Sequence, residues 1–447
     1  MPRPILRRTL AIDTTQPIGF WRQTFSALNL MLGAGVFVGM GIAINVAGVG
    51  IMGAVTVAAL LALVNQGSVA QPSARAAALF STASFSADRL IDSEAPVYTD
   101  WQYFTADWML FLARLTAVAT AALGIAGYWL QGFWLVDPIW LMPTALLVVV
   151  ALTIISFRGL IPRKGAELMA TLAVLLAMIA LLGLIFAGLP ETPRLNLQNL
   201  GWLPLRAERS LGLLAPVANF LQAVALMSAA YASDPHPSQT TTQTSSKAAR
   251  FALVLAWLLY LGVVGVGLRA LESLPNRHSD PTTVLMAPWV NVMQNLPLPG
   301  GVYLVALGAV AAMAAMALHL LSKLVDGLLE LSCSPTVFSR RQPSESPLSP
   351  RLAKLLISSA LGGIVFVGDV KTIWSFSAFA FLLHAALMHR IAVRQSSAQT
   401  PCWRHRLGFA ACLFLAFWVN WDVWLVGLGL VALALIWRGV QYWSEEP

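Results

Sequence analysis

Glycines interrupt the first long apolar segment of the sequence at a spacing that could create a binding site. The segment from Phe25 to Ile51 has no charged residue, and Gly33, Ala34, Gly35 and Val36 lie near its middle. Glycine adopts non-helical torsion angles and leaves backbone amides uncovered. An interrupted membrane helix persists only where the interruption faces protein or a water-filled cavity, and secondary transporters bind substrate at such breaks. Small residues along a membrane helix also permit close helix packing, so the pattern alone leaves both interpretations open.

Polar side chains inside other apolar segments are the next candidates. Asn219 and Gln222 are three residues apart, so a helix places them on one face, next to Phe220. They are candidate ligands for polar groups of a substrate, or partners in hydrogen bonds between helices. Arg114 is an ionisable residue within a span, which marks a functional candidate. Because arginine reaches the membrane interface readily, and Asp107 is an alternative partner, a structural role is favoured for it.

Several classes of function have no support in the sequence. The three cysteines lack the spacing of a metal site or a disulfide framework. There is no glycine-rich phosphate loop with its Lys-Ser/Thr pair, and no nucleophile paired with a base. We therefore expect no enzymatic activity, no cofactor and no metal. The net charge of +8 comes from Lys and Arg clusters between apolar segments, which are topology signals rather than nucleic-acid contacts.

The elements that must position these residues are membrane helices. Hydrophobic residues make up 58% of the 447 residues, charged residues only 11%, and the mean hydropathy is +0.72. This composition predicts an integral membrane protein, an all-α polytopic chain with about 12 transmembrane helices. The expected spans are 24–46, 49–70, 102–129, 138–157, 165–189, 210–232, 249–271, 301–332, 352–368, 372–393, 405–419 and 421–440. Residues 71–100 are expected to form a surface helix and loop, and residues 272–300 a longer linker.

Lys and Arg are concentrated on one side of these spans, the side that also holds both chain ends. By the positive-inside rule that side is cytoplasmic. The sequence thus predicts a protein of the plasma (inner) membrane, in contact with the lipid bilayer, with a cytoplasmic N-terminal segment 1–23 and a cytoplasmic C-terminus.

The motif GAGVFVGMGIAINVAG, residues 33–48, resembles the first-helix signature of the amino acid–polyamine–organocation (APC) superfamily. Residues 144–160 resemble the fourth helix of that superfamily, ending in a turn at Ser156 to Gly159, and Ser322-Lys323 resembles the end of the eighth. The resemblance implies one transporter domain over 1–447 with two inverted five-helix repeats, 24–189 and 210–393, and two added helices in 405–440. It implies discontinuous first and sixth helices.

The resemblance also implies a function. Members of this superfamily are permeases that move amino acids or related amines, and they bind the substrate carboxylate on the exposed amides of the first-helix break. Carried over, these amides would be those of Gly33, Ala34, Gly35 and Val36. The corresponding stretch of the sixth helix would be Phe220 to Leu226, which adds Asn219, Phe220 and Gln222 as candidate substrate ligands.

The sequence departs from the superfamily in two places that bear on transport. The glycine that lets the sixth helix unwind is Ala225 here, and alanine favours a helix over glycine by about 1 kcal/mol. The fifth-helix lysine of proton-coupled members is replaced by Val174, so the coupling ion is unknown. These departures keep a second hypothesis open, a transport-inactive relative that serves as a membrane sensor or assembly subunit.

Overall fold

The computed structural model describes the chain in ten stretches, together with Leu296. The stretches are 20–82, 98–134, 138–158, 163–188, 215–232, 242–273, 287–294, 298–333, 349–395 and 403–444. All regular elements in these stretches are helices, which confirms the predicted all-α class.

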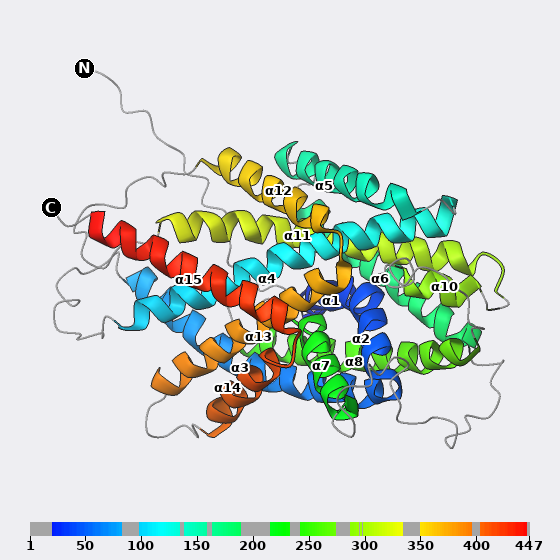
Figure 1. Cartoon of the computed structure of the whole chain (residues 1–447), viewed down its shortest axis with the longest axis horizontal. Coiled ribbons are helices and arrows are strands. Elements are labelled where there is room, and N and C mark those ends of the chain that lie inside the picture. Colours follow the sequence, from blue (N-terminus) through cyan, green and yellow to red (C-terminus); the bar gives the residue numbers. More distant parts are fainter. Residues whose placement is uncertain are drawn as a thin grey trace.

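The described part of the first half of the chain forms five helical stretches (Figure 1). They are α1 (Phe20–Leu32) with η1 (Gly35–Gly39) and α2 (Met40–Ala47), α3 (Ile51–Thr82), α4 (Tyr98–Trp129) extended by η4 (Leu130–Trp134), α5 (Leu141–Arg158) and α6 (Arg163–Gly188). Short 3-10 turns, η2 (Gly48–Gly50) and η5 (Pro138–Trp140), precede α3 and α5.

The second half contains α7 (Ala215–Ala230), α8 (Thr242–Ser273), the short α10 (Pro288–Gln294), α11 (Gly301–Cys333), α12 (Pro350–Val367) and α13 (Val370–Gln395). Two further helices, α14 (Trp403–Ala416) and α15 (Trp421–Ser444), complete the chain. Nine helical stretches of the described residues are long and apolar enough to span a membrane, one of them covering two predicted spans; α7 and α14 are shorter. The protein is therefore an integral membrane protein with many helices, as predicted.

The helix packing repeats itself after five spans. Helix α4 packs on α13 as α11 packs on α6, α1 packs on α8 as α7 packs on α3, and α1 packs on α6 as α7 packs on α13. In each comparison the two contacts are equivalent if the first five spans correspond in order to the next five. The first five are α1, α3, α4, α5 and α6, and the next five are α7, α8, α11, α12 and α13. This pairing agrees with the two five-helix repeats that the resemblance implies, and their inverted orientation in the membrane stays a prediction.

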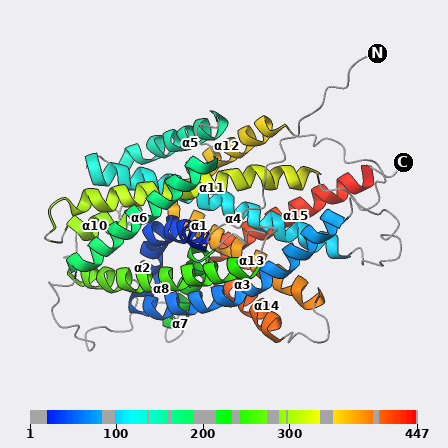
Figure 2. The same cartoon turned by 180° about the vertical axis from the view of Figure 1, so that it is seen from behind.

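The first helix lies at the centre of this arrangement. In both views α1 and α2 are surrounded by the other helices, whereas α5 and α12 lie side by side at one edge (Figures 1 and 2). Every described residue from Met31 to Ile44 is buried. The helix expected within residues 71–100 is present up to Thr82, where it continues α3 without a break, and residues 83–97 lie outside the described stretches.

Candidate functional site

The first membrane helix departs from α-helical geometry at the predicted glycines. Helix α1 ends at Leu32, Gly33 forms a turn, and Gly35–Gly39 form a π-helical turn before α2 begins at Met40. A π-helical turn is a wider turn that often marks a functional site. The interruption expected from the sequence is therefore present, although it is a widened turn rather than an extended segment.

Three aromatic side chains from other elements bind carbonyl groups at this interruption. The Tyr128 hydroxyl donates to the carbonyl of Phe37 at 2.8 Å, and the indole Nε1 of Trp289 donates to the carbonyl of Val36 at 2.7 Å. The Tyr260 hydroxyl donates to the carbonyl of Met31. These donors come from α4, α10 and α8, so the altered turn is held in place by tertiary contacts. Buried carbonyls need such partners when the regular helical pattern is lost.

The glycines of the break also serve close packing. A Cβ at Gly33 would lie 2.3 Å from the Met316 Sδ, and one at Gly39 would lie 2.6 Å from the Trp374 ring. At Gly35 a Cβ would lie 2.8 Å from the Ala230 Cβ. The two interpretations of the glycine pattern are thus compatible, because the small residues let α7, α11 and α13 approach an interrupted helix.

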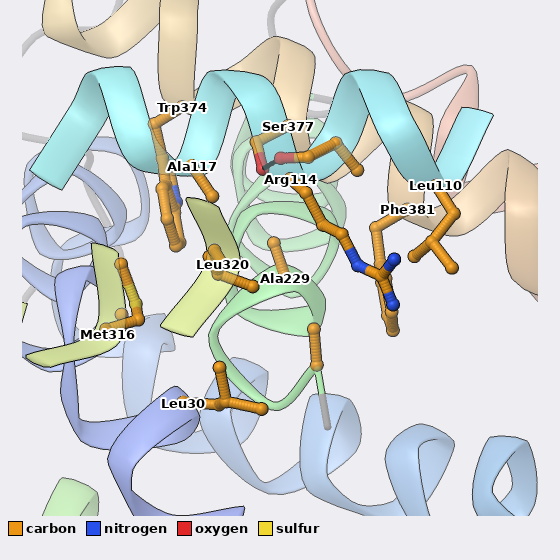
Figure 3. Close-up of a pocket in the computed structure, with 13 residues that line it drawn as sticks. Leu30, Leu110, Arg114, Ala117, Ala229, Met316, Leu320, Trp374, Ser377 and Phe381 are labelled. Carbon is orange, nitrogen blue, oxygen red and sulfur yellow. Dashed lines mark hydrogen bonds between the residues drawn. The ribbon is translucent and has the colours of Figure 1, made fainter. Parts of the chain in front are cut away.

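A cavity of about 60 Å³ lies directly beside the break (Figure 3). Helices of both repeats form its wall. The lining residues are Leu30 of α1, Gly35 of η1, Leu110, Ala113, Arg114 and Ala117 of α4, Ala229 and Ala232 of α7 and its end, Met316 and Leu320 of α11, and Trp374, Ser377 and Phe381 of α13. Most of this wall is apolar. A cavity of this size has room for roughly four to six water-sized groups.

The polar side chains of the lining are Arg114, Trp374 and Ser377. The Ser377 hydroxyl donates to the carbonyl of Ala113 at 3.0 Å, which joins α13 to α4. The Trp374 side chain is 3% exposed, and its Nε1 has no hydrogen-bond partner in the described structure. The arginine guanidinium and the indole N–H are hydrogen-bond donors only.

The structure separates the candidate residues into two places. Of the four first-helix residues, only Gly35 lines the cavity. The amide of Ala34 donates to the Met316 Sδ at 3.4 Å, and the carbonyl of Val36 accepts from Trp289. These two backbone groups of the segment are therefore engaged by side chains of the protein itself.

The three sixth-helix candidates lie outside the cavity wall. Gln222 donates its Nε2 to the Oδ1 of Asn420 at 2.8 Å, which links α7 to the turn between α14 and α15. The Phe220 ring faces Gly53 of α3, where a Cβ would approach it to 3.1 Å. Asn219 is half-buried on the same helix. The side chain of Gln222 thus forms a hydrogen bond between helices, which was the alternative to binding a substrate.

The sixth helix does not unwind where the resemblance suggested. Helix α7 is continuous through Phe220 to Leu226 and ends at Ala230. Its 16 residues span about 24 Å, less than the roughly 30 Å of a bilayer core. The helix therefore ends in the protein interior beside Gly35, with Ala230 and Tyr231 both 2% exposed.

The α13 and α11 residues of the wall were not recognised from the sequence. Trp374 and Ser377 lie within a predicted span, and the close occurrence of Trp374, Ser375 and Ser377 was the available signal, since polar groups inside a span need partners. Met316 and Leu320 carried no signal, because they look like any apolar residues of a membrane helix.

Comparison with known proteins supports a transporter. No protein-family profile matches the chain. The chain is similar to proteins named as uncharacterized transporters, one from Mycobacterium bovis and two from strains of Mycobacterium tuberculosis. Each is 23% identical over 468 aligned residues, which cover 99% of this chain and 94% of the relative. The similarity therefore extends over the whole membrane domain.

Proposed function

We propose that this protein is a secondary transporter that moves amino acids or related amines across the plasma membrane by alternating access, with both termini in the cytoplasm. The observation that carries the proposal is the cavity beside the interrupted first helix. Its wall combines α1, η1 and α4 of the first repeat with α7, α11 and α13 of the second. In alternating access, one repeat rocks against the other around a site at their interface.

The proposal agrees with two further findings. The chain is a polytopic helical membrane protein, and its nearly full-length relatives are named as transporters. The resemblance of residues 33–48 to the APC signature supplies the substrate class. We therefore place the site at Gly35 and the cavity wall, close to the first-helix residues expected from the sequence.

Uptake and binding experiments test this function. Proteoliposomes preloaded with one amino acid or amine should accumulate the labelled compound by counterflow for at least one member of a broad panel. The same ligand should stabilise the purified protein, by about 2.7 kcal/mol at a hundredfold excess over Kd. Gly35→Leu should abolish both effects, because its Cβ would lie 2.8 Å from the Ala230 Cβ and the larger side chain must displace the end of α7 beside the cavity. Gly265→Leu is the matched control, since a Cβ there meets no atom within 4 Å.

A second candidate function, a transport-inactive sensor or assembly subunit, rests on α7. This helix is unbroken at Ala225 and is linked to the added C-terminal helices through Gln222 and Asn420. Ligand binding without counterflow would support this second function. Counterflow exchange would exclude it.

A further inference from the structure

The edge formed by α5 and α12 carries basic side chains that the proposed transport function does not use. Lys354 near the start of α12 bonds to Ser156 near the end of α5, whereas a Cβ on Gly362 would contact Leu146, earlier in α5. The two helices, which lie side by side in Figure 1, therefore run antiparallel. The start of α12 and the end of α5 meet at the membrane side that the sequence predicts to be cytoplasmic.

A small hollow of about 10 Å³ lies between α5, α11 and α12 at this place. Its lining consists of the polar residues Thr153, Ser156, Lys354 and Ser358 and the apolar residues Leu321, Val325 and Ile357. The hydroxyl oxygens of Thr153 and Ser358 lie 2.9 Å apart and join the two helices. The hollow has room for about one water-sized group, such as a single oxygen of a phosphate.

The Lys354 ammonium is only partly used by its contacts within the protein. Its Nζ donates to the carbonyl of Ser156 at 2.7 Å and lies 5.6 Å from the centre of the Phe157 ring. This carbonyl is among the last four of α5, which have no partner within the helix, so Lys354 completes that helix end. An ammonium has three donors. The described structure gives Lys354 one such hydrogen bond and no carboxylate as a counter-ion.

Two exposed arginines lie next to Lys354. Arg158 directly follows Phe157, and Arg351 is three residues before Lys354, on the same face of α12. The start of a helix favours anionic groups, yet the first turn of α12 contains Arg351 and no acidic residue. Three positive charges therefore gather at the positive end of a helix dipole. An anion placed there would relieve their mutual repulsion.

The surface beside this basic cluster is apolar. Ile154 is 45% exposed, Phe157 36% and Leu355 57%. Because α5 and α12 lie at the outer edge of the helix arrangement, these side chains face the hydrocarbon of a bilayer (Figures 1 and 2). A ligand with an anionic head and apolar chains matches both parts of this surface, whereas a free anion matches only the basic part.

We propose that Lys354, Arg158 and Arg351 bind the phosphate of an anionic phospholipid whose acyl chains lie along α5 and α12. Basic pockets between membrane helices on the cytoplasmic side recognise lipid headgroups of this kind. Neither α5 nor α12 contributes to the lining of the cavity beside Gly35. The lipid site can therefore be tested whether or not the protein transports a substrate.

Native mass spectrometry of the purified full-length protein in detergent measures the binding of single lipids. We expect phosphatidylglycerol to bind about tenfold or more tightly than phosphatidylcholine with the same acyl chains, whose headgroup has no net charge. Inorganic phosphate at the same concentration should not displace the lipid, because it lacks the chains. Equal affinities for the two lipids, or displacement by inorganic phosphate, would overturn the proposal.

Charge removal at the cluster should weaken this binding. We expect about tenfold or more for Lys354→Gln, since a hydrogen bond between charged groups is lost. Arg351→Gln should weaken it about fivefold, the effect of one basic side chain near an anionic lipid surface. Arg404→Gln is the matched control, because Arg404 is also exposed on the predicted cytoplasmic side but packs over Trp403 of α14. Equal weakening by Arg404→Gln and Arg351→Gln would indicate unspecific attraction and overturn the proposal.

A role of Lys354 in completing α5, without lipid binding, makes a different prediction. Phosphatidylglycerol in phosphatidylcholine nanodiscs should raise the unfolding temperature of the parent protein, and Lys354→Gln should lose most of this gain. An equal gain in both proteins would leave only the structural role and reject the lipid site. Should Lys354→Gln fail to fold, the double variant Arg158→Gln/Arg351→Gln answers the same question, because both arginines are exposed and Lys354 stays in place.

Discussion

The first helix and α7 occupy equivalent places in the two repeats, and they are built differently. The first helix is interrupted at Gly33 and Gly35, and its irregular carbonyls accept hydrogen bonds from Tyr128, Tyr260 and Trp289. Helix α7 is regular over all 16 residues and simply ends beside Gly35. One element depends on distant side chains for its geometry, whereas the other depends on its own backbone pattern.

This difference has a consequence for movement. An element held by tertiary hydrogen bonds changes shape only when those bonds change, whereas a regular helix moves as a rigid body. We therefore expect the first-helix break to respond to substitutions in α4, α8 and α10, and α7 to respond to substitutions within itself. The following predictions test this contrast.

The largest effect is expected from Gly35→Ala. The added Cβ would lie 2.8 Å from the Ala230 Cβ and 3.0 Å from the Ala230 Cα, so the backbone at the end of α7 must shift. Overpacking of this kind costs about 1 to 3 kcal/mol. Unfolding in mixed detergent micelles should show a loss near the top of this range. Gly265→Ala should be neutral or slightly stabilising, and equal losses in both variants would contradict the close packing of α7 on the break.

A smaller effect is expected from Tyr260→Phe. The substitution removes the hydroxyl that donates to the carbonyl of Met31, leaving a buried acceptor without this partner. We expect a loss of about 1 to 2 kcal/mol in the free energy of unfolding. Hydrogen exchange of the amides at Gly33–Gly39 should also become faster. Tyr303→Phe is the control, because Tyr303 is 54% exposed.

Ala225→Gly tests the regularity of α7. Ala225 is fully buried in the middle of this helix, and glycine there should destabilise it by about 1 kcal/mol. Faster hydrogen exchange confined to α7 would agree with a helix that depends on its own backbone. If the rigidity of α7 suppresses transport, the same variant should increase counterflow. Unchanged exchange in α7 would show that its neighbours hold it instead.

The smallest effect concerns the link from α7 to the C-terminal helices. A double-mutant cycle of Gln222→Leu and Asn420→Leu should give a coupling of about 0.6 kcal/mol, the typical value for a hydrogen bond between membrane helices. A coupling of zero would show that this bond does not hold α7 to the C-terminal helices. The affinity for a ligand of the cavity should be the same in both single variants and the parent protein, because neither residue lines the cavity.

The sequence predicted the membrane class and the helical spans well, because length and apolarity determine which segments cross a bilayer. It also located the interruption of the first helix, since the glycines at 33 and 35 are local signals. A helix after residue 70 was expected, but its continuity with α3 up to Thr82 was not, because an alanine-rich segment suits a separate surface helix and a longer helix equally.

The cavity wall could be predicted only in part. Gly35 was found from its own segment. The position of Trp374 in the wall depends on its packing against Gly39 and on the contact between Ser377 and Ala113. Both contacts join residues more than 250 positions apart in the sequence. Gln222 looked like a ligand because its partner, Asn420, follows 198 residues later. Without knowledge of such pairings, a polar residue in a span has no assigned role.

The side chains that complete the first helix have a consequence for assembly. Three of them belong to Tyr260, Trp289 and Met316 in the second half of the chain, and the fourth belongs to Tyr128 in the first half. During synthesis the first five spans enter the membrane before any of the first three residues exists. A fragment that ends after α6 would therefore leave the carbonyls of Met31 and Val36 without their side-chain donors. The first helix to be inserted is thus expected to be among the last to reach its final geometry.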